Sequence, residues 1–154
     1  MTTLQIKVIF LGDREKTYNS WDFLDEKEIV VNIKGLDCYN NKLISLPNSL
    51  DKCTKLVNLY CNNNNLISLP DSLGKCTKLV YLDCHNNKLI SLPDLLCNCT
   101  NLQKLLCYSN KLISLPNSLC NYANLQYLYC SYNKLISLPD SLGKCTKLKY
   151  LYCP

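Results

Sequence analysis

The sequence has few of the residues that common kinds of catalysis and membrane insertion need. It contains one histidine, one tryptophan, one methionine, four glycines and a single arginine, Arg14. No apolar run approaches the roughly 18 to 20 residues of a membrane-spanning helix, and residues 1–10 alternate polar with apolar side chains where a signal peptide would have an apolar core. We therefore expect a soluble protein that is not secreted and has no membrane partner.

Signatures of catalysis and cofactor binding are also scarce. His85 has Asp83 two residues before it, but the intervening Cys84 is expected to point to the opposite face, so no nucleophile lies beside the pair. Residues 6–17 have one glycine where a phosphate-binding loop needs two at fixed spacing. We therefore expect no enzyme, no catalytic residue and no cofactor.

What the sequence does contain is a 23-residue segment that recurs in register. Residues 56–78 read LVNLYCNNNNLISLPDSLGKCTK, and the shared pattern is LxxLxCxxNxLxxLPxxLxxCxx. The copies cover residues 33–55, 56–78, 79–101, 102–124 and 125–147, with a partial copy at 148–154. Within each copy LxxLxC alternates as a half-buried strand does, and the proline later ends any ladder. Such a short unit cannot bury its own apolar face, so it must stack on its neighbours.

This pattern resembles that of the leucine-rich repeat family, in the variety that carries LPxxL after the asparagine. It departs in having cysteine where the family often has its third strand leucine. The resemblance implies an α/β repeat fold, a solenoid with a parallel sheet on its concave side and short irregular or helical returns on its convex side. It also implies binding, usually of a protein. The segment NKLISLPDSLGKCTKL (residues 133–148) is in addition similar to the sequences of leucine-rich proteins of giant DNA viruses, which suggests a viral protein.

Residues 1–32 lie outside the repeats and are expected to cap the first one. Residues 4–10 alternate as a strand does, Gly12 and Asp13 form a turn signal, and residues 28–31 are expected to form another extended run. This segment has four basic and six acidic residues, against 13 and six in residues 33–154. Residues 148–154 have no comparable cap, which predicts an exposed strand edge there.

The 12 cysteines fall mainly into two columns. One column occupies the strands: Cys38, Cys61, Cys84, Cys107, Cys130 and Cys153. The other lies late in the returns: Cys53, Cys76, Cys99 and Cys145, with Tyr122 in the same position once. We expect these thiols to pack as small apolar groups in the core and to stay reduced, which favours the cytoplasm. Redox-active thiols and a metal site remain alternatives, although no CxxC pair occurs and we expect no metal.

An asparagine follows the strand in every copy. The residues are Asn41, Asn64, Asn87, Asn110 and Asn133. Because an asparagine amide has both donors and an acceptor, an inward side chain here can satisfy backbone groups that stacking would bury. In the family this column is an asparagine ladder, and we expect a structural role.

The third, fifth and seventh positions of each strand segment share the concave face and vary between copies. They hold most of the 11 tyrosines. Tyrosine offers a large rigid ring with a polar tip, as in the energetic centres of many interfaces, although it is also a good strand former. We predict partner-binding residues at Tyr39, Tyr60, Tyr81, Asp83, His85, Tyr108, Tyr127, Tyr129, Tyr150 and Tyr152.

Lysines lie in stripes away from that face, after the asparagine and near the end of each return. They could attract nucleic acid, but lysine is equally the usual solvating residue of a repeat surface, so we expect a protein partner instead. Two alternatives to a protein-binding module remain open. The chain could associate with itself through the edge at residues 148–154, or it could be a fragment of a longer solenoid.

Overall fold

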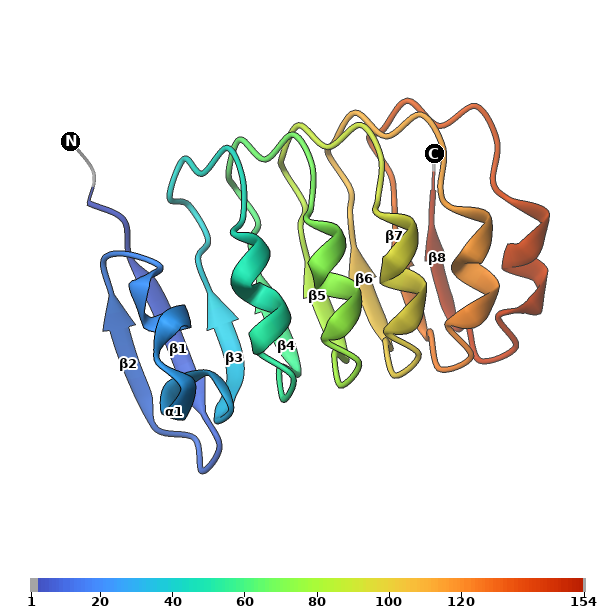
Figure 1. The fold of residues 1–154 in the computed structure, drawn as a ribbon. Coiled ribbons are helices and arrows are strands. Elements are labelled where there is room, and N and C mark those ends of the chain that lie inside the picture. The colour runs from blue at the N-terminus through green and yellow to red at the C-terminus, as the bar shows by residue number, and fades with distance from the viewer. Residues whose placement is uncertain (1–2, 154) are drawn as a thin grey trace.

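A computed structural model describes residues 3–153, apart from the side chain of Cys120. It forms one eight-stranded sheet of order β2-β1-β3-β4-β5-β6-β7-β8, with short helices along the opposite side (Figure 1). The strands are β1 (Ile6–Phe10), β2 (Glu15–Tyr18), β3 (Ile33–Asp37), β4 (Asn58–Tyr60), β5 (Tyr81–Asp83), β6 (Lys104–Leu106), β7 (Tyr127–Tyr129) and β8 (Tyr150–Tyr152). The predicted solenoid of parallel strands and short helical returns is confirmed.

Within the described residues, each complete repeat returns through a short 3-10 helix: η2 (Asn48–Lys52), η3 (Asp71–Lys75), η4 (Asp94–Asn98), η5 (Asn117–Asn121) and η6 (Asp140–Lys144). The segment before the repeats contains a further 3-10 helix, η1 (Asp22–Asp25), and an α-helix, α1 (Lys27–Val30). A proline precedes each helix from η2 to η6, with an extended ψ near +140°, as at Pro70 and Pro139. Proline fixes φ and lacks an N–H donor, so the chain leaves the strand ladder there and turns into the helix.

Strands β3 to β8 pair in parallel with the same register at every step. Leu59 lies between Leu36 and Leu82, and the next three strands continue this row. Since the repeat has a constant length of 23 residues, strands β3 to β7 present their leucine and cysteine to the core and their variable residues to the concave face.

Residues 3–32 pair with the first repeat through β1, and one prediction for this segment is wrong. Strand β1 pairs antiparallel with β2 and β3, and Gly12 (φ 86°) and Asp13 (φ 58°) make the turn between β1 and β2. Residues 28–31 were predicted to be extended, but α1 occupies 27–30. The amides of Ile29 and Val30 donate to the carbonyl of Glu26 at 2.9 and 3.1 Å, so this segment satisfies its own backbone and its strand pairing begins only at β3.

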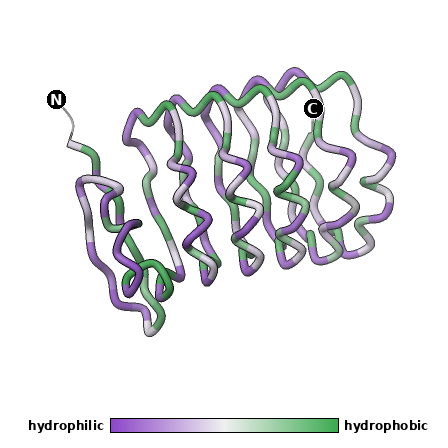
Figure 2. The backbone as a smooth tube through the Cα atoms, in the orientation of Figure 1, coloured by the Kyte–Doolittle hydropathy of each residue, from purple (hydrophilic) through white to green (hydrophobic). Residues whose placement is uncertain are grey.

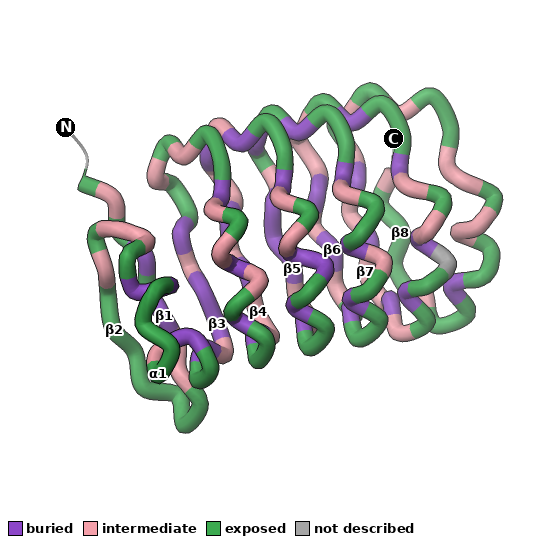
Figure 3. The backbone as a smooth tube through the Cα atoms, viewed as in Figure 1, coloured by how far each residue is buried: buried purple, intermediate pink, exposed green. Residues whose placement is uncertain are grey.

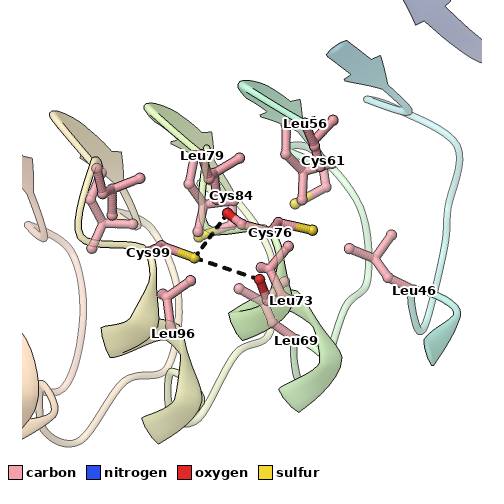
Figure 4. Close-up of a cluster of buried hydrophobic side chains, with 14 of the residues drawn as sticks. Leu46, Leu56, Cys61, Leu69, Leu73, Cys76, Leu79, Cys84, Leu96 and Cys99 are labelled. Carbon is pink, nitrogen blue, oxygen red and sulfur yellow. Dashed lines mark hydrogen bonds between the residues drawn. The ribbon is translucent and has the colours of Figure 1, made fainter. Parts of the chain in front are cut away.

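The core consists of stacked leucine and cysteine columns between the sheet and the 3-10 helices (Figure 4). The Cys99 thiol donates to the carbonyls of Leu73 and Cys76 at 3.5 and 3.4 Å. All cysteines that the structure describes are free thiols, and nine of those 11 are buried. Burial raises the pKa of Cys76 and Cys99 to about 12, so these thiols stay protonated at neutral pH. The predicted packing role is confirmed for the buried columns.

The asparagine column connects neighbouring repeats through their backbones. The Asn87 amide donates to the carbonyls of Cys61 and Cys84 at 3.0 and 3.1 Å, and its oxygen accepts from the Leu66 amide at 2.9 Å. Asn64 makes the corresponding contacts one repeat earlier. Each asparagine thus satisfies backbone groups of two repeats, as the sequence predicts.

The last strand of the sheet is less buried than the strand before it (Figure 3). Leu128 in β7 is fully buried, whereas Leu151 in β8 is 39% exposed and Tyr150 and Tyr152 are about half exposed. No helix within residues 3–153 has the length and hydropathy to cross a membrane. Across the same residues, no three His, Cys, Asp or Glu side chains gather closely enough to hold a metal ion.

Candidate functional site

We call the side chains at the third, fifth and seventh positions of the strand segments the concave surface. The parallel register aligns them in rows across the sheet. The first row is Gly35, Asn58, Tyr81, Lys104, Tyr127 and Tyr150. The second row is Asp37, Tyr60, Asp83, Leu106, Tyr129 and Tyr152. The third row is Tyr39, Asn62, His85, Tyr108 and Ser131.

Aromatic rings of neighbouring strands form pairs on this surface. The ring centroids of Tyr127 and Tyr150 are 5.0 Å apart at an interplanar angle of 5°, and those of Tyr129 and Tyr152 are 4.6 Å apart at 15°. Parallel strands lie about 4.8 Å apart, so identical positions on adjacent strands hold rings at stacking distance. Each ring limits the rotation of its neighbour, so the pairs order the tyrosines in the C-terminal half of the concave surface.

The N-terminal half has aromatic pairs of a different composition. Tyr60 and Tyr81 lie 5.0 Å apart with their rings tilted by 41°, and the His85 ring stacks on Tyr108 at 4.4 Å and 7°. Tyr39 is 55% exposed at the cap end, and its ring stacks on no other ring among the described residues. The structure thus places all eight predicted tyrosines on the sheet face or at its rim, seven of them in pairs.

Asp83 is buried within the concave surface. The residue is 7% exposed, so it offers little surface to a partner. Its Oδ1 atom lies 2.6 Å from Nδ1 of His85, and it also accepts from the His85 amide at 3.3 Å. Asp83 is therefore placed to orient the His85 ring, and the His85 side chain is itself 17% exposed.

Two carboxylates give the N-terminal half its electrostatic character. Burial raises the pKa of Asp37, and a hydrogen bond from the Tyr39 amide offsets part of this rise. Burial raises the pKa of Tyr60, and the charges of Asp37 and Asp83 on either side raise it further. The pKa of Tyr81 rises to about 12, chiefly through burial and then through Asp83. These hydroxyls therefore remain neutral hydrogen-bond donors over the physiological range.

Lys104 is a site residue absent from the predicted set. Its ammonium group lies 5.2 Å from the Tyr81 ring centroid and 5.6 Å from that of Tyr127, one strand away on each side. Contact with two ring faces favours a cation. The signal was present in the sequence, because Lys104 occupies the same repeat position as both tyrosines.

A shallow hollow of about 390 Å³ lies next to Lys104. Leu106 forms part of this hollow, and the strands on either side carry Asp83 and Tyr129 at the same position. Tyr108, Tyr129, Tyr132 and Tyr152 also line the hollow. Because Leu106 is smaller than these rings, the hollow leaves room for an apolar side chain of a partner. The concave surface thus offers a partner aromatic contact area, hydroxyl donors and the ammonium group of Lys104.

The repeats match known family models. Residues 123–153 match the model described as Leucine Rich repeats (2 copies), and residues 55–76 and 78–99 match the model described as Leucine Rich Repeat. No curated protein matches the chain significantly.

Solved structures share the fold. A leucine-rich-repeat protein of Leptospira interrogans is 31% identical with a TM-score of 0.67, and the match covers 87% of this chain and 40% of that protein. The functional domain of InlJ from Listeria monocytogenes, described as including a cysteine ladder, is 32% identical with a TM-score of 0.72, covering 82% of this chain and 26% of that one. The plant peptide hormone receptor RGFR1, in complex with RGF2, is 26% identical with a TM-score of 0.71, covering 82% and 22%.

The fold and these matches define a leucine-rich-repeat solenoid. The chain belongs to the leucine-rich repeat family, whose members generally act as modules of protein–protein interaction. It matches only 22 to 40% of the length of the three structures named above.

Proposed function

We propose that this chain is a non-enzymatic binding module that holds a protein partner against its concave surface. The observation that carries the proposal is the ordering of aromatic rings there into stacked pairs around Lys104. Rings that are already fixed lose little conformational entropy on binding, and tyrosine contributes strongly at interface centres. The plant receptor RGFR1, which is bound to RGF2, supports a protein or peptide as the class of partner.

Affinity capture with matched variants tests this proposal. The immobilised, reduced chain is compared with a concave variant, Tyr81→Ser, Tyr129→Ser and Tyr152→Ser, and with a control variant, Lys55→Ser, Lys78→Ser and Lys144→Ser. The control lysines are exposed and lie away from the concave surface. We expect proteins that the wild type and the control retain equally and the concave variant loses by at least about tenfold. Equal retention by all three folded chains would contradict the proposal.

The exposed edge of β8 favours self-association as a second candidate function. Leu151 in β8 is 39% exposed, and no strand within the described residues pairs with its outer side. Light scattering on the reduced chain distinguishes the candidates. A dimer that Leu151→Lys converts to a monomer would support pairing through this edge, whereas a wild-type monomer at high concentration would contradict it.

A further inference from the structure

A second surface of the solenoid combines exposed apolar and cationic side chains in register. One isoleucine from every repeat is 57 to 91% exposed, although isoleucine is ordinarily a core residue. These residues are Ile44, Ile67, Ile90, Ile113 and Ile136. They lie where the chain turns from the strands toward the 3-10 helices. This upper edge alternates hydrophobic and hydrophilic segments in Figure 2 and is largely exposed in Figure 3.

Backbone hydrogen bonds between repeats hold these isoleucines in a line. The amide of Ile113 donates to the carbonyl of Ile90, and that of Ile136 to Ile113, each at 3.4 Å. The amide of Lys111 donates to the carbonyl of Leu89 at 2.9 Å. The segments therefore lie side by side, and the spacing of the isoleucines is fixed by the fold.

A row of lysines runs beside the isoleucines. Lys88 and Ile90 are exposed and the intervening Leu89 is buried, so the chain alternates and both exposed side chains share one side. The same arrangement recurs at Lys111 and Lys134. Lys42 occupies the same repeat position with a left-handed backbone (φ 56°), and Asn65 takes the lysine position in the remaining repeat. The lysines are Lys42, Lys88, Lys111 and Lys134. We call these lysines and the five isoleucines the Ile–Lys edge.

The cap extends the Ile–Lys edge with the only tryptophan of the chain. Trp21 is half-buried and lines a hollow of about 430 Å³ together with Leu4, Lys42 and Ile44. Tryptophan is enriched where proteins meet the headgroup region of a bilayer, because its ring is apolar and its N–H is polar. Trp21 therefore adds a third side chain of interfacial chemistry at one end of the row.

We propose that the Ile–Lys edge binds the surface of an anionic lipid bilayer. Protein interfaces are depleted in lysine and enriched in arginine and aromatic residues, whereas a row of apolar side chains flanked by lysine is typical of interfacial lipid binding. The edge contains no carboxylate and presents the same two kinds of side chain, isoleucine and lysine, along its length. Such a uniform surface suits a fluid lipid bilayer of negative charge. Binding is peripheral and leaves the concave surface free for a protein. The absence of long apolar runs predicts no membrane partner, but this edge has one isoleucine in every 23 residues and so forms no such run.

Binding to vesicles of defined composition tests the proposal. The probes are vesicles of phosphatidylcholine alone and of phosphatidylcholine with phosphatidylserine at about three to one. Sedimentation measures binding, and emission of Trp21 reports contact at the edge. We expect binding and a blue shift with the anionic vesicles only. Ile67→Ser, Ile90→Ser and Ile113→Ser together should weaken binding at least about tenfold, and Lys88→Gln, Lys111→Gln and Lys134→Gln by about a hundredfold.

The controls keep the result specific to this surface. Lys55→Gln, Lys78→Gln and Lys144→Gln remove the same charge from elsewhere and should retain most of the binding. All substituted side chains are exposed, so circular dichroism should show an unchanged fold. No binding of the wild type to anionic vesicles would overturn the proposal, as would equal losses in the control and edge lysine variants. Undiminished binding of the isoleucine variant, or binding of a protein at this edge in place of lipid, would also overturn it.

Discussion

Gly74 in η3 packs against the carbonyl group of Leu95 in η4. A Cβ atom added to Gly74 would overlap that backbone oxygen, whereas one added at the equivalent Gly143 would meet nothing within 4 Å. The contact joins two repeats through their backbones, and only glycine permits it.

The first prediction concerns this contact. Gly74→Ala should lower the free energy of unfolding by about 1 to 3 kcal/mol, because the neighbouring repeat must shift. Gly143→Ala should leave it unchanged or raise it by up to about 1 kcal/mol through the reduced freedom of the unfolded chain. Urea unfolding followed by circular dichroism measures both, and a loss of the same size at the two positions would refute the explanation.

The second prediction concerns the asparagine column. Asn87→Ala removes contacts to both Cys61 and Leu66. It leaves the buried amide of Leu66 without a partner, whereas the Cys61 carbonyl keeps its hydrogen bond from Asn64. An unsatisfied buried group costs about 1 to 3 kcal/mol, so the variant should be destabilised by more than an exposed substitution would be. Asn65→Ala is the control and should change the free energy by no more than about 0.5 kcal/mol. Comparable losses in thermal unfolding would argue against the ladder as a source of stability.

Tyr122 gives the third prediction, because it is fully buried in a column that otherwise holds cysteine. No partner for its hydroxyl is found among the described side chains and backbone. Tyr122→Phe should therefore raise the free energy of unfolding by up to about 1 kcal/mol, since it removes an unsatisfied polar atom. Tyr122→Cys should lower it by about 3 to 5 kcal/mol through the cavity it leaves. A destabilised phenylalanine variant would show that the hydroxyl is bonded.

The fourth prediction follows from the buried thiols. Burial raises the pKa of Cys38 and Cys76 to about 12, from an ordinary value of 9.0. Above pH 9 the unfolded chain loses these protons while the folded chain keeps them, so stability falls as the pH rises toward 12. Each thiol contributes a slope of about 1.4 kcal/mol per pH unit.

Urea midpoints measured from neutral pH to about pH 10 check this dependence. Below pH 9 the thiols should contribute nothing to it. Cys76→Ala is the matched variant, because it has one titrating group fewer and should show a shallower alkaline slope. Identical slopes for this variant and the wild type would mean that the thiol ionises equally in both states.

Much of the fold follows from the repeat. Its constant length aligns Leu59 and Cys61 with their counterparts, so burial, strand positions and the asparagine column could all be predicted. The cap could not be predicted as well, because Ile29 and Val30 are adjacent β-branched residues that favour a strand by propensity. Their amides instead bond to Glu26, and β1 already pairs with β3, so tertiary structure overrides propensity there.

The candidate site was predictable in outline for a similar reason. Alternation along one strand places tyrosines on the concave surface, but burial of Asp83 depends on side chains from neighbouring strands. Lys104 was overlooked because its significance lies across the sheet, between Tyr81 and Tyr127, and not along its own strand. Relationships between repeats, such as these and the Ile–Lys edge, become visible only when the repeats are stacked.

Site-specific photo-cross-linking tests the central claim most directly. A photoreactive phenylalanine analogue replaces Tyr129 on the concave surface, and in a separate chain it replaces Lys78 on a turn outside it. We expect a partner protein to cross-link to the chain that carries the analogue at position 129, and no protein to cross-link to the chain that carries it at position 78. Cross-linking of that protein through position 78, with none through position 129, would contradict the concave surface as the binding site.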